Sequence, residues 1–270
     1  FRECRGTEFL ERVIAVDQRP MGRTSRSNTA TYTGLLTDIR RLFAELPEAK
    51  VRGYGPGQFS FNAPEGACPE CGGSGVTGVR RGILEEIQLT CPTCEGSRYR
   101  GEVLQVRYRH KSIAEVLDLS ADEAVQFFDP VPSLARRLAL LVEMGLGYLC
   151  LGQPASSLSG GEAQRVKLCG ELSRPQQARS LYILDEPTTG LHLDDIHYLV
   201  LLLQRLGDSG NSVLVVEHNI ELVAAADHII DLGPEAGADG GEVVATGAPR
   251  DVAAASASHT GQYLQRYLNR

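Results

Sequence analysis

Two pairs of cysteines have the spacing of a metal site. In order, they are Cys68, Cys71, Cys91 and Cys94. Zn²⁺ prefers four ligands in a tetrahedron, and each C-x2-C turn can present two thiolates to one ion. A redox-active C-x-x-C would instead need a thioredoxin-like βαβ context, which this Gly-rich stretch lacks. We therefore predict that these four cysteines hold a structural Zn²⁺ in a module that spans residues 67–100.

A second set of residues has the types and order needed for ATP hydrolysis. An apolar run ends in Asp185 and Glu186, and a second apolar run leads to Glu217 and His218. Catalysis of phosphoryl transfer is mostly positioning and charge stabilisation. Asp185 could hold Mg²⁺, Glu186 could orient or deprotonate the attacking water, and His218 could contact the γ-phosphate. The alternative for His218 is a structural histidine in a loop.

A phosphate could also bind where residues 158–162 begin a helix, which the pattern AQRVKL (163–168) predicts to be amphipathic. The run 158–162 is made of Leu158, Ser159, Gly160, Gly161 and Glu162. Backbone N–H groups and the positive end of the helix dipole would face an anion here. The alternative is a Gly-rich helix cap. Each motif is weak alone, but their order along the chain favours a nucleotide site.

The elements that must position these residues alternate along the chain. Fully apolar strands alternating with helices indicate a buried sheet, so we predict an α/β fold with a mostly parallel sheet and flanking helices. A helical region and the zinc module interrupt this core. The expected strands are 11–17, 180–185, 211–218, 228–232 and 242–247. The expected helices are 31–45, 112–118, 120–128, 133–144, 193–206 and 219–226.

Composition narrows the possible classes of protein. The chain has 270 residues, 42% of them apolar, and a net charge of −7. This excludes collagen, mucin-like stalks and a wholly disordered chain, and it argues against a uniformly basic surface. Basic residues near the zinc module could be solvated surface or could contact nucleic-acid phosphates. They are Arg80, Arg81, Arg98, Arg100, Arg107, Arg109 and Lys111.

The sequence also predicts where the protein is located and how its three remaining cysteines are placed. The longest apolar run, 198–203, is too short for a bilayer, and the first residues lack the apolar stretch of a signal peptide. We expect no membrane association and a cytoplasmic protein. Cys4, Cys150 and Cys169 are expected to be small buried apolar residues.

The motifs together resemble the ABC-type ATPase superfamily and, within it, the UvrA family of DNA-repair excinucleases. Four segments carry the resemblance beside the cysteine module: VDQRPMGRTSRSNTATYTG (16–34), LGQPASSLSGGEAQRVKL (151–168), LYILDEPTTGLH (181–192) and VVEHN (215–219). The resemblance implies the C-terminal part of the second ATPase module. It further implies a core segment at 1–50, an inserted signature region at 51–150, and the signature helix with the C-terminal core at 151–270.

The resemblance also implies roles, cofactors and partners. Gln18 would be the Q-loop residue that senses Mg²⁺ and the γ-phosphate, and His192 would lie in the D-loop region. Residues 158–162 would be the signature, Asp185 and Glu186 the Walker B pair, and His218 the switch histidine. The implied cofactors are ATP, Mg²⁺ and Zn²⁺. The implied partners are damaged double-stranded DNA, the excinuclease component UvrB and a second copy of the complete protein.

Two departures from the family pattern matter. No G-x-x-x-x-G-K-[ST] P-loop occurs in the sequence, which begins at Phe1. We therefore expect a fragment whose P-loop lies upstream and which has negligible ATPase activity alone. Cys169-Gly170 also stands where a better helix former is expected. Three alternatives remain: a UvrA-like paralogue in drug self-resistance, a zinc-hook recombination ATPase (disfavoured by the absence of long heptads), and a zinc-dependent DNA-binding module without its own ATPase activity.

Overall fold

The computed structural model describes residues 5–16, 26–79, 87–173, 179–189, 191–233 and 241–269. The chain forms two compact units. The sheet unit comprises Phe1–Gln18 and Gln176–Arg270, and the helical unit comprises Arg19–Pro175. This division groups residues by packing, whereas the boundaries expected at 50 and 150 follow ATPase motifs and stay a prediction.

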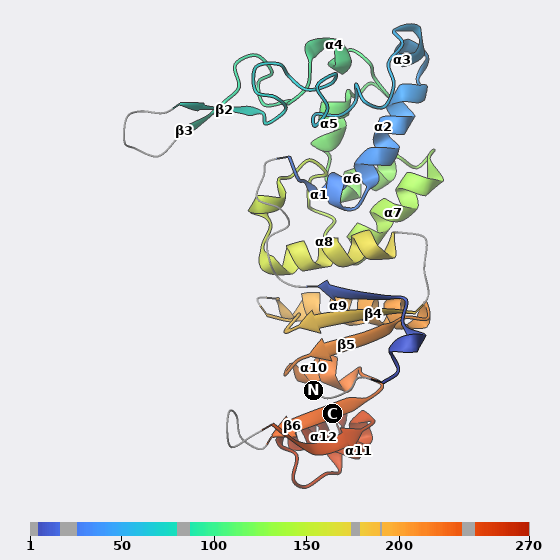
Figure 1. The fold of residues 1–270 in the computed structure, drawn as a ribbon, viewed down its shortest axis with the longest axis vertical. Helices are drawn as coiled ribbons and strands as arrows, with labels where there is room; N and C mark the ends of the chain where they lie inside the picture. Colours follow the sequence, from blue (N-terminus) through green and yellow to red (C-terminus); the bar gives the residue numbers. More distant parts are fainter. Residues whose placement is uncertain are drawn as a thin grey trace. The chain divides into compact units, whose positions relative to one another are not determined.

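Three parallel strands form the centre of the sheet unit, in the order β1 (Arg12–Val16), β4 (Ser180–Asp185), β5 (Ser212–Val216). A short 3₁₀ turn, Thr7–Phe9, precedes β1. Apolar side chains of α9 (Leu193–Asp208) are buried where this helix packs along β5. The parallel sheet predicted from the alternation of apolar strands and helices is therefore confirmed (Figure 1).

The last strands of the sheet unit pair differently from the first three. β6 (Ile229–Gly233) and β7 (Glu242–Gly247) are antiparallel and form a sheet of their own. Three helices, α10 (Ile220–Ala224), α11 (Pro249–Ala253) and α12 (His259–Leu268), pack around this hairpin. Their shared core consists of Val223, Ile229, Val252 and Leu264.

The helical unit is built from short helices. These are α1 (Thr29–Tyr32), α2 (Leu35–Glu45), α3 (Pro47–Val51), α4 (Gly101–Leu104), α5 (Ile113–Leu117), α6 (Ala121–Phe127), α7 (Pro132–Glu143) and α8 (Gly160–Leu172), with a 3₁₀ turn at Ala155–Ser157. The helix α7 contacts α2, α6 and α8 (Figure 1). Capping boxes start α5, α6 and α8, because a serine and a glutamate three residues later satisfy each other's backbone N–H.

Two details of the helical unit differ from the sequence-based expectation. The helix expected at 31–45 is broken into α1 and α2, because Gly34 has a left-handed backbone with φ of 75°. The signature helix α8 was expected to be amphipathic, yet it is buried on most sides, and Gln164 and Arg165 are buried with it. A Cβ at Gly170 would lie 3.3 Å from the Tyr32 carbonyl oxygen, so a small residue lets α8 approach α1.

The zinc-module hairpin consists of β2 (Val76–Val79) and β3 (Ile87–Thr90), which are antiparallel. It projects from the helical unit and buries little apolar surface, since Gln88, Leu89 and Thr90 are exposed (Figure 1). None of the helices in the described part of the chain has the length and apolar character needed to cross a bilayer.

Candidate functional site

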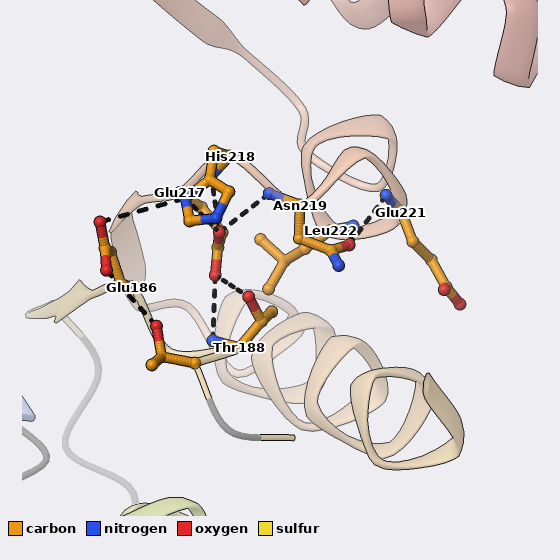
Figure 2. Close-up of polar contacts among 8 residues, drawn as sticks. Glu186, Thr188, Glu217, His218, Asn219, Glu221 and Leu222 are labelled. Atoms are coloured by element: carbon orange, nitrogen blue, oxygen red, sulfur yellow. Dashed lines mark hydrogen bonds and ion pairs between the residues drawn. The ribbon is translucent and has the colours of Figure 1, made fainter. Parts of the chain in front are cut away.

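The sheet unit brings the acidic pair and the histidine together at one edge. Asp185 is the last residue of β4 and lies opposite Val216, the last residue of β5. Carboxyl ends of parallel strands meet at the same sheet edge, so the residues that follow both strands are neighbours. The Glu186 N–H donates to the Val216 carbonyl at 2.8 Å. His218 Nδ1 lies 4.0 Å from Glu186 Oε1 (Figure 2).

The side chains of His218 and Glu186 are both open to solvent and can reach a ligand. The side chains of His218 and Glu186 are 78% and 56% exposed. Glu186 has φ of 42°, a left-handed conformation that is uncommon for a residue other than glycine. Such a backbone persists only where neighbouring contacts hold it. The Thr189 N–H donates to the Glu186 carbonyl at 3.0 Å, and the Thr189 hydroxyl to its carboxylate at 3.4 Å.

Glu217 directly precedes His218 and contacts the loop that carries Glu186. Its position in the sequence indicated no role for it. It accepts hydrogen bonds from Thr188, His218 and Asn219 (Figure 2). Burial alone would raise the pKa of Glu217, but these hydrogen bonds outweigh burial and lower the pKa below its ordinary value. A carboxylate at the end of an apolar strand was the available signal, although the sequence does not show its partners.

The signature residues form a capped helix start in the helical unit. Ser159 is the N-cap of α8, and its hydroxyl accepts from the Glu162 N–H while Glu162 accepts from the Ser159 N–H at 2.7 Å. Leu158 precedes this cap. Gly160 and Gly161 occupy the first turn, where backbone N–H groups have no acceptor within the helix. Such N–H groups occur at every helix start, so anion binding at residues 158–162 stays a prediction.

Glu162 has a second partner that the sequence did not indicate. The Tyr148 hydroxyl donates to Glu162 Oε1 at 2.5 Å. Burial raises the pKa of Glu162, but hydrogen bonds from Tyr148 and Ser159 outweigh it and lower the pKa overall. Both carboxylate oxygens are therefore occupied within the helical unit, and Glu162 supports the turn rather than presenting a free carboxylate.

His192 and Gln18 are the two remaining residues predicted for the nucleotide site. His192 is exposed just before α9, and its carbonyl accepts from the Asp195 and Ile196 N–H groups at 3.0 and 3.3 Å. Gln18 lies outside the described residues.

The four paired cysteines converge as the spacing predicted. Their sulfur atoms all lie within 4.8 Å of one another, with 4.0 Å between Cys68 and Cys91 and 3.7 Å between Cys71 and Cys94. A tetrahedral ion with Zn–S bonds of about 2.3 Å requires sulfur–sulfur distances of about 3.8 Å. Both the donor set and the spacing therefore fit Zn²⁺.

Glycines shape the loops around these sulfur atoms. The Gly75 N–H donates to Cys71 Sγ at 3.3 Å. Burial would raise the pKa of Cys71, but the Gly75 and Gly73 N–H groups help to lower it to about 7, whereas burial raises the pKa of the neighbouring Cys94 to about 12. Gly73 has φ of 85°, and a Cβ there would lie 1.8 Å from the Phe61 carbonyl oxygen. Only glycine fits this position.

Two other cysteines in the described part of the chain, Cys150 and Cys169, lie outside the cluster. Cys169 is buried as expected, and burial raises its pKa to about 12. Cys150 is only half-buried, which corrects the expectation of a buried residue, and burial also raises the pKa of its thiol. Cys4 lies outside the described residues.

Most of the arginines near the zinc module have partners within the chain. Arg98 lies over the Phe61 ring at 5.3 Å, Arg107 pairs with Glu115 at 3.1 Å, and Arg109 donates to the Phe127 carbonyl at 2.6 Å. These contacts favour a structural surface role for those three. Arg80 and Arg81 lie outside the described residues.

One cavity beside the first cysteine pair is basic. Its volume is about 310 Å³, and its lining includes Arg26, Asn62 and Arg100 but no carboxylate. Arg26 donates to the Gly72 carbonyl at 3.0 Å, and Arg100 donates to the Pro64 carbonyl at 3.2 Å. Carbonyl partners do not neutralise a guanidinium, so both arginines keep their charge at this cavity.

Known proteins that share one name match this chain along nearly its whole length. No protein-family model matches it. UvrABC system protein A from Streptococcus mutans is 51% identical over 269 residues, and its namesake from Methanothermobacter thermautotrophicus is 53% identical over 266. The chain spans 28% of the length of each relative. UvrA2 from Deinococcus radiodurans has a TM-score of 0.87 and 50% identity, covering 97% of this chain and 32% of that one. The chain therefore belongs to the UvrA family.

Proposed function

We propose that this chain forms part of a UvrA-type ATPase that recognises DNA damage in bacterial nucleotide excision repair. The observation that carries the proposal is the 4.0 Å approach of His218 to Glu186, next to Asp185, in a chain of this family. The complete protein would hydrolyse ATP and use that reaction to load the excinuclease component UvrB on damaged DNA.

The residues at the sheet edge have complementary roles in this proposal. Asp185 would hold Mg²⁺, which neutralises phosphate charge when it is bound. Glu186 would orient or deprotonate the attacking water, and its exposed carboxylate can reach a substrate. His218 would contact the γ-phosphate. The parallel register supports these roles, because it places all three residues at the ends of adjacent strands.

The signature residues would act on a nucleotide held by another ATPase module. Ser159 and Glu162 hold the first turn of α8, which leaves the Gly160 and Gly161 N–H groups for a phosphate. Gln18 keeps its proposed role in sensing the nucleotide, and His192 its proposed place in the D-loop region, on the family relationship alone. The four-cysteine cluster would hold a structural Zn²⁺.

The proposed partners also rest on the family relationship. They are damaged double-stranded DNA, UvrB and a second copy of the complete protein. A second candidate is a UvrA-like paralogue in drug self-resistance, which would share the motifs of this chain. We prefer the repair function because the relatives named for the UvrABC system are 51% and 53% identical along the chain.

The test uses a UvrA-type protein in which residues 1–270 replace the homologous segment. We expect ATP hydrolysis, tighter binding to damaged than to intact duplex DNA, and loss of hydrolysis with Glu186→Gln while ATP still binds. The matched control Glu221→Gln should hydrolyse ATP normally. Unchanged hydrolysis in the Glu186→Gln protein would refute the proposed catalytic role. Complementation of a repair-deficient strain separates the two candidates, since a resistance paralogue would not restore ultraviolet survival.

A further inference from the structure

Glu217 is buried in the middle of an exposed site. Its side chain is 2% exposed, whereas that of the adjacent His218 is 78% exposed. Carboxylates are almost never fully buried unless they are paired or hydrogen-bonded. In the described residues, its partners are backbone and hydroxyl donors of the two loops that carry Glu186 and His218, together with the His218 imidazole, whose Nδ1 lies 3.7 Å from Oε2.

The two carboxylate oxygens of Glu217 contact different loops. Oε1 accepts from the Thr188 N–H at 2.9 Å and from the Thr188 hydroxyl, two residues after Glu186. Oε2 accepts from the His218 N–H at 2.6 Å and the Asn219 N–H at 2.9 Å. One side chain thus joins the loop after β4 to the loop after β5 (Figure 2).

A simpler role would be to cap the following helix. That role is already filled, because the Asn219 side chain accepts from the Glu221 and Leu222 N–H groups at the start of α10. Capping would also need only the local oxygen, Oε2. The bonds from Oε1 to Thr188 span 29 positions in the sequence and have no function in starting α10.

We propose that Glu217 is a positioning residue that holds Glu186 and His218 at their working separation. The inference rests on the proposed ATPase function. Glu186 has a left-handed backbone, and the loop that contains it needs restraint to keep that conformation. The bonds to Thr188 supply restraint from one side, and those to His218 and Asn219 fix the histidine on the other.

The variant Glu217→Gln tests this positioning role without removing side-chain volume. An amide has one acceptor oxygen, and its NH2 group would face N–H donors that need an acceptor. Glu221→Gln is the matched control, since it makes the same charge change nearby and the Glu221 side chain points away from Thr188 (Figure 2). In the 270-residue chain, amide hydrogen exchange at Thr188, His218 and Asn219 should accelerate about tenfold or more in the first variant only.

Steady-state kinetics in the UvrA-type protein carrying residues 1–270 provide the second readout. Glu217→Gln should lower kcat about 10- to 100-fold, because small misplacements of catalytic groups have effects of that size. The KM for ATP should change less than about twofold, since uniform binding contacts remain. Glu221→Gln should match the wild type in both parameters.

A second variant covers the case in which Glu217→Gln does not fold. Thr188→Val removes the hydroxyl donor but keeps the backbone N–H, so it should lower kcat in the same direction by a smaller factor. Unchanged exchange at Thr188 and His218 in Glu217→Gln, or equal kcat losses in both glutamine variants, would overturn the proposal. Absence of hydrolysis in the UvrA-type protein that carries the unmodified residues 1–270 would instead refute the proposed function. The exchange measurements would still decide whether Glu217 holds the two loops together.

Discussion

Replacing Cys71 with serine should unfold the zinc module. The change removes one of four sulfur atoms that lie within 4.8 Å of one another. Structural Zn²⁺ sites contribute on the order of 10 kcal/mol to local folding. Apart from Tyr99, which is buried against Phe61, the described part of the module has little apolar packing, because its buried cluster consists of the cysteines themselves and Leu89 of the hairpin is 51% exposed. The loss therefore exceeds what the remaining contacts of the module can supply.

The rest of the helical unit should survive, since its core lies elsewhere. Leu35, Ile39, Leu138 and Leu141 are fully buried between α2 and α7 and do not depend on the metal. We expect Cys71→Ser to expose residues 67–100 to limited proteolysis and rapid hydrogen exchange while protection of α2 and α7 persists.

Elemental analysis and proteolysis would check this prediction. The wild-type chain should carry one Zn²⁺ per molecule, and Cys71→Ser should lose it. Cys150→Ser is the matched control, because Cys150 is half-buried and lies outside the cluster. A purified wild-type chain without bound zinc would refute the metal assignment. A Cys71→Ser chain that resists protease at 67–100 would refute the energetic reasoning.

Three further predictions follow from single contacts. Residues 1–270 alone should show negligible ATP turnover because the sequence contains no P-loop motif; robust turnover that Glu186→Gln abolishes would contradict this. The depressed pKa of Glu162 stabilises the fold above its ordinary value of 4.5, and this stability is lost as pH falls through the lower folded-state pKa; unfolding midpoints in urea from pH 6 to pH 3 should fall more steeply for the wild type than for Glu162→Gln. Gly73→Ala should cost at least about 3 kcal/mol, from the overlap with the Phe61 carbonyl and from its positive φ. Gly53→Ala, where φ is 69° but nothing lies within 4 Å, should cost only about 1–2 kcal/mol in the same denaturation assay.

Local patterns predicted the parts of the fold that depend on neighbouring residues. The helices α5 to α7 and the parallel strands β4 and β5 were predicted and are present. The break at Gly34 was missed, because apolar periodicity continues through 31–45 and gives no sign of a left-handed residue. Pairing of β6 with β7 was also not foreseen, since strand propensity does not specify a partner strand.

The chemical groups and their order can be recognised in the sequence: four thiols at C-x2-C spacing, an acidic pair, a Ser-Gly-Gly turn and a histidine. These signals are short, so residue type and spacing are enough to recognise them. Which of these groups meet depends on the tertiary structure. It placed His218 against Glu186, engaged Arg98, Arg107 and Arg109 within the chain, and assigned Glu217 its partner Thr188. Such contacts join residues distant in the sequence, and they form because strand register and burial, rather than local spacing, bring donors and acceptors together.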